Sequence, residues 1–247
     1  MITPRLYVGD EPMAPVPGAD YALPEAAARH VGQVLRMRVG ASVALFTGDG
    51  GEFAATICGI ERRGVTLRID RHDPVEREAP WAVTLGQSII AADMMDFVVR
   101  KAVELGVAAI QPLQSARSQN AAEDRIARRL AHWRRIAIAA CEQCGRNRIP
   151  GIAPPVSFAQ WFAAAGDASR PVAILDAASE RSLASLCANA APRAILVGPE
   201  GGFDAAEVRL AHARGAAPVH LGARVLRAET AALAALATLN AIAGDAR

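Results

Sequence analysis

Several features that would assign this chain of 247 residues to a common class are missing from it. No apolar run is long enough to cross a bilayer, and the first residues, MITPRLYVGDEP, contain no hydrophobic signal core. We therefore expect a cytoplasmic protein without membrane association. The net charge of +2 is too small to indicate a nucleic-acid-binding protein by itself.

Lysine and cysteine are both scarce. Lys101 is the only lysine, and it either marks a site that a guanidinium would not serve, pairs with Glu104 on a helix, or remains by chance. Cys141 and Cys144 form a CxxC pair, but no second pair or histidine cluster nearby completes a zinc site. The strand-to-helix context of a redox centre is also missing. We therefore expect core-facing cysteines and no bound metal.

The GxGxxG and P-loop patterns are absent too, although a glycine-rich turn follows a predicted buried strand. The strand covers 194–197, the turn covers 198–202, and a helix follows with Asp204 as N-cap and Glu207 as capping-box partner. Parallel strands of this kind open at their C-terminal ends into ligand-binding crevices. The turn is thus predicted to bind a ligand, and a tight turn without a ligand is the alternative.

The strand and helix patterns predict an α/β protein with a small β domain in front. Residues 1–72 contain short β-forming runs between glycine turns, typical of an antiparallel barrel or sheet, with one helix over 24–37. Residues 73–80 are the predicted linker. In residues 81–247 strands and helices alternate, which predicts a mostly parallel sheet covered by helices. The expected strands cover 83–90, 108–113, 172–176, 194–197 and 218–221. The expected helices cover 93–105, 123–144, 157–164, 182–188, 204–214 and 229–243.

Arginines concentrate between positions 117 and 148. This segment contains eight arginines and three acidic residues. Such an excess suits a phosphate backbone, and a solvated helix face is an equally good interpretation.

Several short segments, taken together in this order and spacing, resemble one family. They are RLYV at 5–8, Arg29-His30, Val34-Leu35-Arg36, the glycine turn at 48–51, and the segments 101–107, 142–150 (EQCGRNRIP), 198–203 (GPEGGF) and 221–231 (LGARVLRAETA). The whole chain is similar to the RsmE family, which methylates N3 of a uridine in 16S ribosomal RNA. The resemblance implies a PUA-like β-barrel followed by a SPOUT-type α/β domain with a C-terminal trefoil knot. It also implies S-adenosyl-L-methionine as methyl donor, the small ribosomal subunit as partner, and a homodimer.

The resemblance assigns roles to individual residues. Cofactor binding is expected from backbone groups and apolar walls at Leu175, Val197, Gly198, Glu200, Gly201, Gly202, Leu221, Gly222, Leu226 and Ala228. Uracil N3 must lose a proton before it attacks, so Arg227 is the predicted catalytic cation and Glu200 or Glu229 the predicted base. The alternatives are that Glu200 caps the adjacent turn or helix and that Glu229 only begins a helix. RNA contact is expected from Arg29, His30, Arg36, Arg117, Arg146 and Arg148.

Two other functions fit parts of the sequence. A catalytically silent RNA-binding protein would keep the barrel and the arginines, but it would have little use for the glycine turns and the Arg227–Thr230 segment. A SPOUT enzyme acting on transfer RNA or on another base is disfavoured by the N-terminal barrel and the 142–150 segment, through the resemblance alone.

Overall fold

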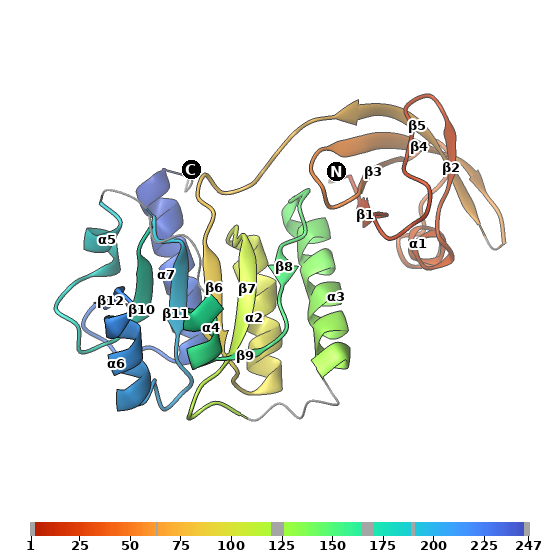
Figure 1. The fold of residues 1–247 in the computed structure, drawn as a ribbon. Coiled ribbons are helices and arrows are strands. Elements are labelled where there is room, and N and C mark those ends of the chain that lie inside the picture. Colours follow the sequence, from red (N-terminus) through yellow and green to blue (C-terminus); the bar gives the residue numbers. More distant parts are fainter. Residues whose placement is uncertain (1–2, 63, 120–125, 165–169, 189–190, 245–247) are drawn as a thin grey trace. The chain divides into compact units, whose positions relative to one another are not determined.

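The computed structural model describes residues 3–62, 64–119, 126–164, 170–188 and 191–244 (Figure 1). The chain divides into two compact units, Met1–Glu78 with Cys141–Ile149, and Ala79–Ala140 with Pro150–Arg247. The predicted division put 141–149 in the second domain, whereas these residues pack with the first unit. No helix in the described ranges is both long and apolar enough to cross a membrane.

The first unit is built on the predicted antiparallel hairpins. Its strands are β1 (Arg5–Tyr7), β2 (Asp20–Ala22), β3 (Ser42–Phe46), β4 (Glu52–Ile60) and β5 (Val65–Asp73), in the order β1-β3-β4-β5-β2. The β3–β4, β4–β5 and β2–β5 pairs are antiparallel, and β1 joins β3 in parallel. Leu45, Ile57 and Leu67 are fully buried between these strands. Burial of each such side chain contributes about 1.5–3 kcal/mol.

The predicted helix over 24–37 is shorter than expected. It consists of α1 (Glu25–Arg29) and one turn of π-helix, η1 (His30–Val34). The N–H of Leu35 reaches back to the carbonyl of His30 at 2.9 Å, which widens the last turn. Arg36 then takes a left-handed conformation with φ of 49°, and this ends the helix.

The second unit has the predicted parallel sheet with helices on both faces. Its strands are β6 (Thr84–Ser88), β7 (Ala109–Gln114), β8 (Gly151–Ile152), β9 (Val156–Ser157), β10 (Val172–Leu175), β11 (Ala194–Val197) and β12 (Ala216–Val219). The order is β12-β10-β11-β6-β7-β8, with β9 also on β7, and each of these pairings is parallel. All four side chains of β11 are buried, as expected for a central parallel strand.

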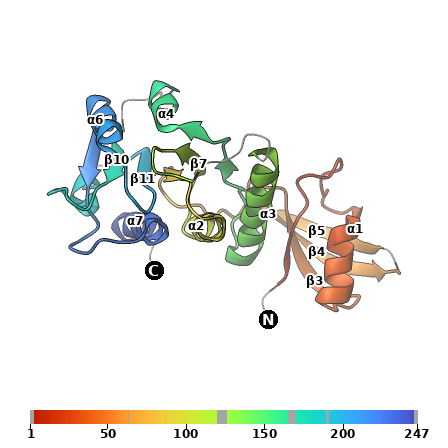
Figure 2. The same cartoon turned by 90° about the horizontal axis from the view of Figure 1, so that it is seen from below.

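The helices of the second unit cover the two faces of this sheet. Figure 2 shows α2 (Ala92–Glu104) and α7 (Ala228–Ala243) on one face, and α4 (Phe158–Ala164) and α6 (Ala205–Ala213) on the other. The remaining helices are α3 (Ile126–Cys144) and α5 (Leu183–Leu186). Residues 123–125, where the sequence predicts the start of α3, lie outside the described residues.

The helix ends test the capping predictions directly. Asp204 is the N-cap of α6 and forms the predicted capping box with Glu207, and Gly106 follows α2 with φ of 82°. The prediction of Asp93 as N-cap of α2 is wrong, because the helix begins at Ala92 and Ala91 is its N-cap. Asp93 still lies in the first turn, where its charge favours the helix dipole.

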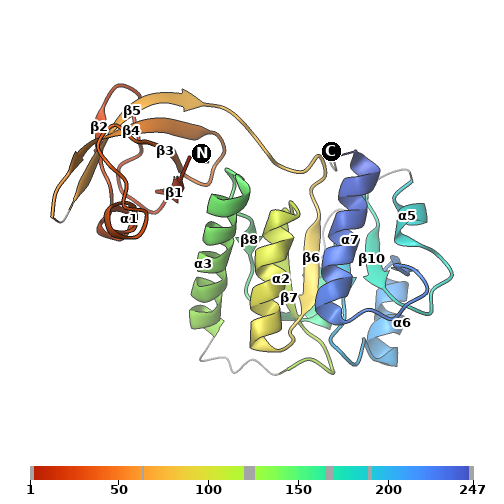
Figure 3. The same ribbon diagram turned by 180° about the vertical axis from the view of Figure 1, so that it is seen from behind.

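The strand order brings the C-terminal elements back across the sheet. β12 pairs with β10 rather than with β11, so the chain passes beyond β10 before it enters α7. α7 then packs beside α2 (Figure 3). This return brings three loops to one edge of the sheet, and the trefoil knot implied by the resemblance stays a prediction.

Candidate functional site at the ends of β10, β11 and β12

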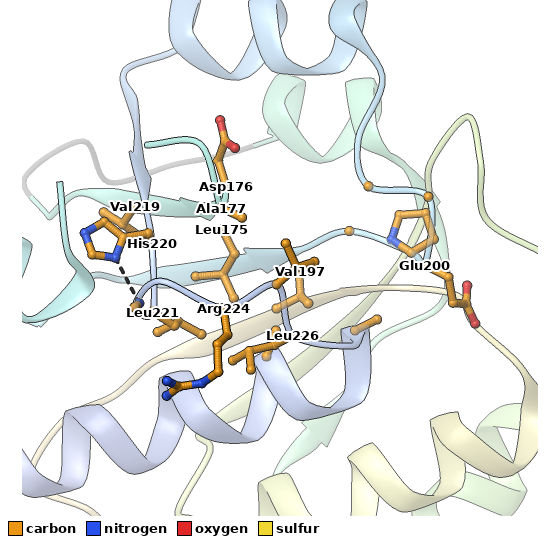
Figure 4. A pocket seen from close by; sticks show the side chains of 18 residues that line it. Leu175, Asp176, Ala177, Val197, Glu200, Val219, His220, Leu221, Arg224 and Leu226 are labelled. Carbon is orange, nitrogen blue, oxygen red and sulfur yellow. Dashed lines mark hydrogen bonds between the residues drawn. The ribbon is translucent and has the colours of Figure 1, made fainter. Parts of the chain in front are cut away.

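The carboxyl ends of β10, β11 and β12 meet at one edge of the sheet. Leu175 at the end of β10 is in register with Val219 at the end of β12, and Ile174 with Leu196 of β11. The loops that follow enclose a cavity of about 310 Å³ (Figure 4). Its lining is Leu175–Ala177, Val197–Gly202, Val219–Gly222, Arg224–Leu226, Ala228 and Ala231.

The centre of the cavity is apolar. Leu175, Val197 and Leu226 gather in the middle of the view in Figure 4. Asp176, Glu200 and Arg224 contribute the charged groups of the lining. An apolar interior with a few polar groups is typical of small-molecule sites.

The loop after β11 is a tight turn that needs its glycines. The N–H of Gly202 donates to the carbonyl of Pro199 at 2.8 Å, and Gly202 has a φ of 68°. A Cβ on Gly198 would lie 3.1 Å from the backbone nitrogen of Phe203, so the turn closes only without a side chain there. The Phe203 ring packs on Phe158 with centroids 4.8 Å apart and anchors the end of the loop.

Glu200 is exposed at the tip of this loop. Its carboxylate makes no hydrogen bond or ion pair with the part of the chain that the structure describes. Asp204 and Glu207 cap α6, so the alternative capping role of Glu200 is not seen.

The loop after β12 is held by backbone hydrogen bonds. The N–H of His220 donates to Arg181 at 2.8 Å, and the carbonyl of His220 accepts from Leu183 at 3.0 Å. Nδ1 of His220 accepts from the N–H of Gly222 at 2.9 Å, the dashed line in Figure 4. The φ of 116° at Gly222 favours glycine at this turn. Further on, Val225 is 86% exposed although it is apolar.

The start of α7 completes the edge of the site. Arg227 is the N-cap of α7 and is exposed, and Glu229 is half-buried in the first turn. Neither lines the cavity, whereas their neighbours Leu226 and Ala228 do. All ten residues predicted to bind the cofactor line the cavity, and cofactor binding by them stays a prediction.

Sequence reasoning missed part of the lining. Asp176 and His220 line the cavity but were placed inside the expected strands 172–176 and 218–221. The strands end one residue earlier at Leu175 and Val219, so these two polar side chains begin the loops of the site. Arg224 and Val225 belong to the 221–231 segment, and they line the cavity as well.

The predicted RNA-contacting residues have different surroundings. In the first unit Arg29, His30 and Arg36 are exposed, and Arg29 pairs with Glu25 at 3.4 Å. Arg148 is exposed and donates to Glu76 at 3.1 Å.

Arg146 is the exception. Its side chain is 4% exposed and pairs with Glu78 through two hydrogen bonds. A buried guanidinium needs such pairing because desolvation of an isolated charge is costly. We therefore correct its predicted role from RNA contact to support of the first unit. Asn147, which the prediction passed over, is fully buried and donates from its side chain to the carbonyl of Val75 at 2.8 Å.

Glu142 and Asn147 of the 142–150 segment also make contacts within the first unit. Arg5 donates to Glu52, to the Asn147 side chain and to the carbonyl of Arg146. The Glu142 carboxylate accepts the N–H of Tyr7 at 3.0 Å, and burial raises the pKa of Glu142 above its ordinary value.

Cys141 and Lys101 follow the simpler interpretations, whereas Cys144, also expected to face the core, is only half-buried. Cys141 is fully buried, and burial raises the pKa of its thiol to about 12, so it stays protonated at neutral pH. Within the described ranges no group of three histidine, cysteine, aspartate or glutamate side chains could hold a metal ion. Lys101 pairs with Glu104 at 2.8 Å.

Comparison with known proteins identifies relatives of the whole chain. The family model described as an RNA methyltransferase PUA domain matches residues 23–70, and the RNA methyltransferase domain matches residues 77–240. Ribosomal RNA small subunit methyltransferase E of Buchnera aphidicola is 30% identical over 98% of this chain and 94% of its own length. The Bacillus subtilis protein of the same name is 29% identical over 85% of this chain and 86% of its own length.

Two solved structures resemble the fold closely, and both contain the same cofactor. Ribosomal RNA small subunit methyltransferase E from Neisseria gonorrhoeae, bound to S-adenosyl methionine, is 35% identical with a TM-score of 0.89. A putative methyltransferase from Legionella pneumophila, in complex with bound SAM, is 39% identical with a TM-score of 0.88. Each similarity covers 98% of both chains.

Proposed function

This chain belongs to the ribosomal RNA small subunit methyltransferase E family, and we propose that it uses S-adenosyl-L-methionine to methylate N3 of one uridine in 16S ribosomal RNA. The observation that carries the proposal is the cavity at the ends of β10, β11 and β12. Motif segments from 198–203 and 221–231 line this cavity together, although they are separate in sequence.

The lining fits S-adenosyl-L-methionine by its chemistry. Leu175, Val197, Leu221 and Leu226 provide apolar walls for the adenine and the methionine chain. The turns at Gly198–Gly202 and at Gly222 bring backbone groups to the rim, and Glu200 is available to ribose hydroxyls. When bound, the cofactor supplies an electrophilic methyl group on a positively charged sulfur.

The start of α7 is the proposed catalytic element. Removal of the N3 proton leaves negative charge on the oxygens of the pyrimidine. Arg227 carries a full positive charge at the N-terminus of this helix, where the dipole adds to it, so both stabilise that anion. Glu200 or Glu229 takes the proton. The chain thereby lowers the barrier mainly by alignment and by charge.

RNA binding is assigned to exposed arginines. We propose that Arg29, His30 and Arg36 hold flanking RNA, and that Arg117 and Arg148 also contact RNA phosphates. The ion pair of Arg148 with Glu76 is exposed and weak, so a phosphate can replace the carboxylate. The partner is 16S ribosomal RNA in the small ribosomal subunit, which places the reaction in the cytoplasm.

We also propose that two copies of the chain form a homodimer through the outer face of α7. After Glu229 this helix has no charged residue. Ala237 and Ile242 are exposed on it, and Leu233 is half-exposed. A second copy would remove this apolar surface from water, which favours association.

The test is methyl transfer to small ribosomal subunits from cells that lack this gene. Labelled S-adenosyl-L-methionine is supplied, the RNA is digested, and the product nucleoside is identified by mass spectrometry. We expect N3-methyluridine at a single position, with transfer falling as salt rises because phosphate contacts release counterions. Label in transfer RNA or on another base would overturn the proposed substrate. Absence of cofactor binding would instead favour the silent RNA-binding protein.

A further inference from the structure

Arg117 contacts the turn of the candidate cofactor site from another part of the chain. One terminal nitrogen of its guanidinium donates to the carbonyl oxygen of Gly201 at 2.6 Å. Its aliphatic stem lies against the same residue, since a Cβ on Gly201 would be 3.2 Å from Cδ and 3.8 Å from Cβ of Arg117. Gly201 is therefore held by both the stem and the charged end of Arg117.

The loop that carries Arg117 is itself fixed. The hydroxyl of Ser118 accepts the N–H of Ser115 at 3.1 Å and donates to its carbonyl at 2.8 Å. The N–H of Ala116 donates to the Glu207 carboxylate at 2.8 Å, and the other oxygen of that carboxylate accepts the N–H of Asp204. The capping box of α6 thus links both loops, and Arg117 reaches Gly201 from a defined position.

The charge of Arg117 is not neutralised locally. Arg117 is exposed, and no carboxylate pairs with it in the part of the chain that the structure describes. The contact with Gly201 uses one nitrogen of the guanidinium, whose planar fork carries five N–H donors. The remaining donors can bind a phosphate while the first stays on the carbonyl.

We propose that Arg117 is a positioning residue that couples RNA binding to the cofactor turn, an inference that rests on the proposed function. A substrate phosphate fixes the guanidinium, the guanidinium fixes the Gly201 peptide, and that peptide sets Glu200 and Gly202 at the cavity. By linkage, RNA then raises cofactor affinity and cofactor raises RNA affinity by the same factor.

The experiment measures this factor by binding, without turnover. Sinefungin, an analogue with no transferable methyl group, is titrated into the full-length protein with and without unmethylated small ribosomal subunits. In the unsubstituted protein we expect subunits to tighten sinefungin binding by about fivefold or more. In Arg117→Ala we expect sinefungin alone to bind about three- to tenfold more weakly, the effect of one lost hydrogen bond, and the coupling factor to fall to about one.

Two further variants separate positioning from charge. Arg117→Lys keeps a cation for phosphate but lacks the planar fork, so we expect RNA affinity within about threefold of the unsubstituted protein together with lost coupling. Gly201→Ala places its Cβ against the Arg117 stem. It should therefore weaken sinefungin binding when Arg117 is present, but much less when it is combined with Arg117→Ala. Gly151→Ala is the matched control, because its Cβ meets no atom within 4 Å.

The outcomes are distinct from those of the methylation test. Absence of coupling in the unsubstituted protein, or an unchanged coupling factor in Arg117→Ala, would overturn the role of Arg117 even if N3-methyluridine is formed. Equal losses from Gly201→Ala with and without Arg117 would also overturn it, since the alanine would then act directly on the cofactor. Failure to form N3-methyluridine despite intact coupling would count against the proposed reaction alone.

Discussion

At the scale of single residues, Arg227 carries the main catalytic prediction. Its side chain is exposed at the N-cap of α7, and it does not line the cavity. We expect Arg227→Ala to lower kcat by about 100- to 1,000-fold, as for loss of one group that stabilises developing negative charge. S-adenosyl-L-methionine affinity should stay within about twofold of the unsubstituted protein, because that charge develops only during the reaction.

The measurement for Arg227 is single-turnover methylation beside calorimetric titration of the cofactor. Arg209→Ala, which removes an exposed arginine from α6, is the control and should leave both quantities unchanged. Arg227→Lys should recover part of the rate. Unchanged turnover in Arg227→Ala would exclude it as the stabilising cation.

Glu142 supplies a prediction about pH. Burial raises the pKa of this carboxyl in the folded state. The hydrogen bond that the carboxylate accepts from the N–H of Tyr7 lowers the pKa, but it offsets only part of this rise. A raised folded pKa means that the folded state binds the proton more tightly than the unfolded state. Its stabilising contribution is therefore complete below the unfolded pKa and is lost as pH rises through the folded pKa.

The test compares urea unfolding of Glu142→Gln with that of the unsubstituted protein from pH 4 upward. The glutamine keeps an oxygen for Tyr7 but does not titrate, so we expect the unsubstituted protein to lose stability relative to the variant as pH rises. Glu25→Gln is the control, because its side chain is 83% exposed and water solvates it in both states. Parallel pH profiles for Glu142→Gln and the unsubstituted protein would contradict the prediction.

At the scale of helices and strands, local signals predicted two elements beside the cavity, β11 and the start of α6. The run Ala194–Val197 forms β11 with the predicted bounds because four apolar residues before a glycine turn suit a central parallel strand. The capping box at Asp204 and Glu207 formed as predicted because it depends only on residues three apart. Since the glycine turns follow strands directly, the residues assigned to the cofactor collected around one cavity.

Features set by distant contacts could not be predicted in this way. The pairing of β12 with β10 is decided by tertiary packing, and β8 and β9 are too short to give an alternating pattern. Arg146 illustrates the same limit. The arginines near it in sequence suggested an RNA-binding surface. In the structure, however, Arg146 is buried and forms an ion pair with Glu78, which lies 68 residues earlier in the chain.

At the scale of the whole molecule, the segment around Arg146 belongs to the first unit and not to the second, where its place in the sequence had put it. Residues Cys141–Ile149 lie late in the sequence but pack with the N-terminal unit. Asn147 accepts from Arg5 and donates to Val75, so strands and loops from both ends of that unit meet at one side chain. Residues Cys141–Ile149 of the EQCGRNRIP motif thus contribute to the fold of the first unit.

The last prediction concerns assembly. Ala237 is exposed in the middle of the apolar outer face of α7, where a second copy is proposed to bind. Ala237→Glu would place a charge in that interface, and an unpaired buried charge is strongly unfavourable. We expect sedimentation velocity to show a dimer for the unsubstituted protein and a monomer for the variant.

Ala159→Glu is the control. Position 159 is exposed on α4, on the other face of the sheet, and this variant should remain dimeric. Circular dichroism of both variants should match the unsubstituted protein, because a glutamate on an exposed helix position is tolerated. A monomeric unsubstituted protein, or a dimeric Ala237→Glu, would exclude α7 as the interface. If the variant is a folded monomer, its cofactor affinity then tells whether one copy alone completes the site.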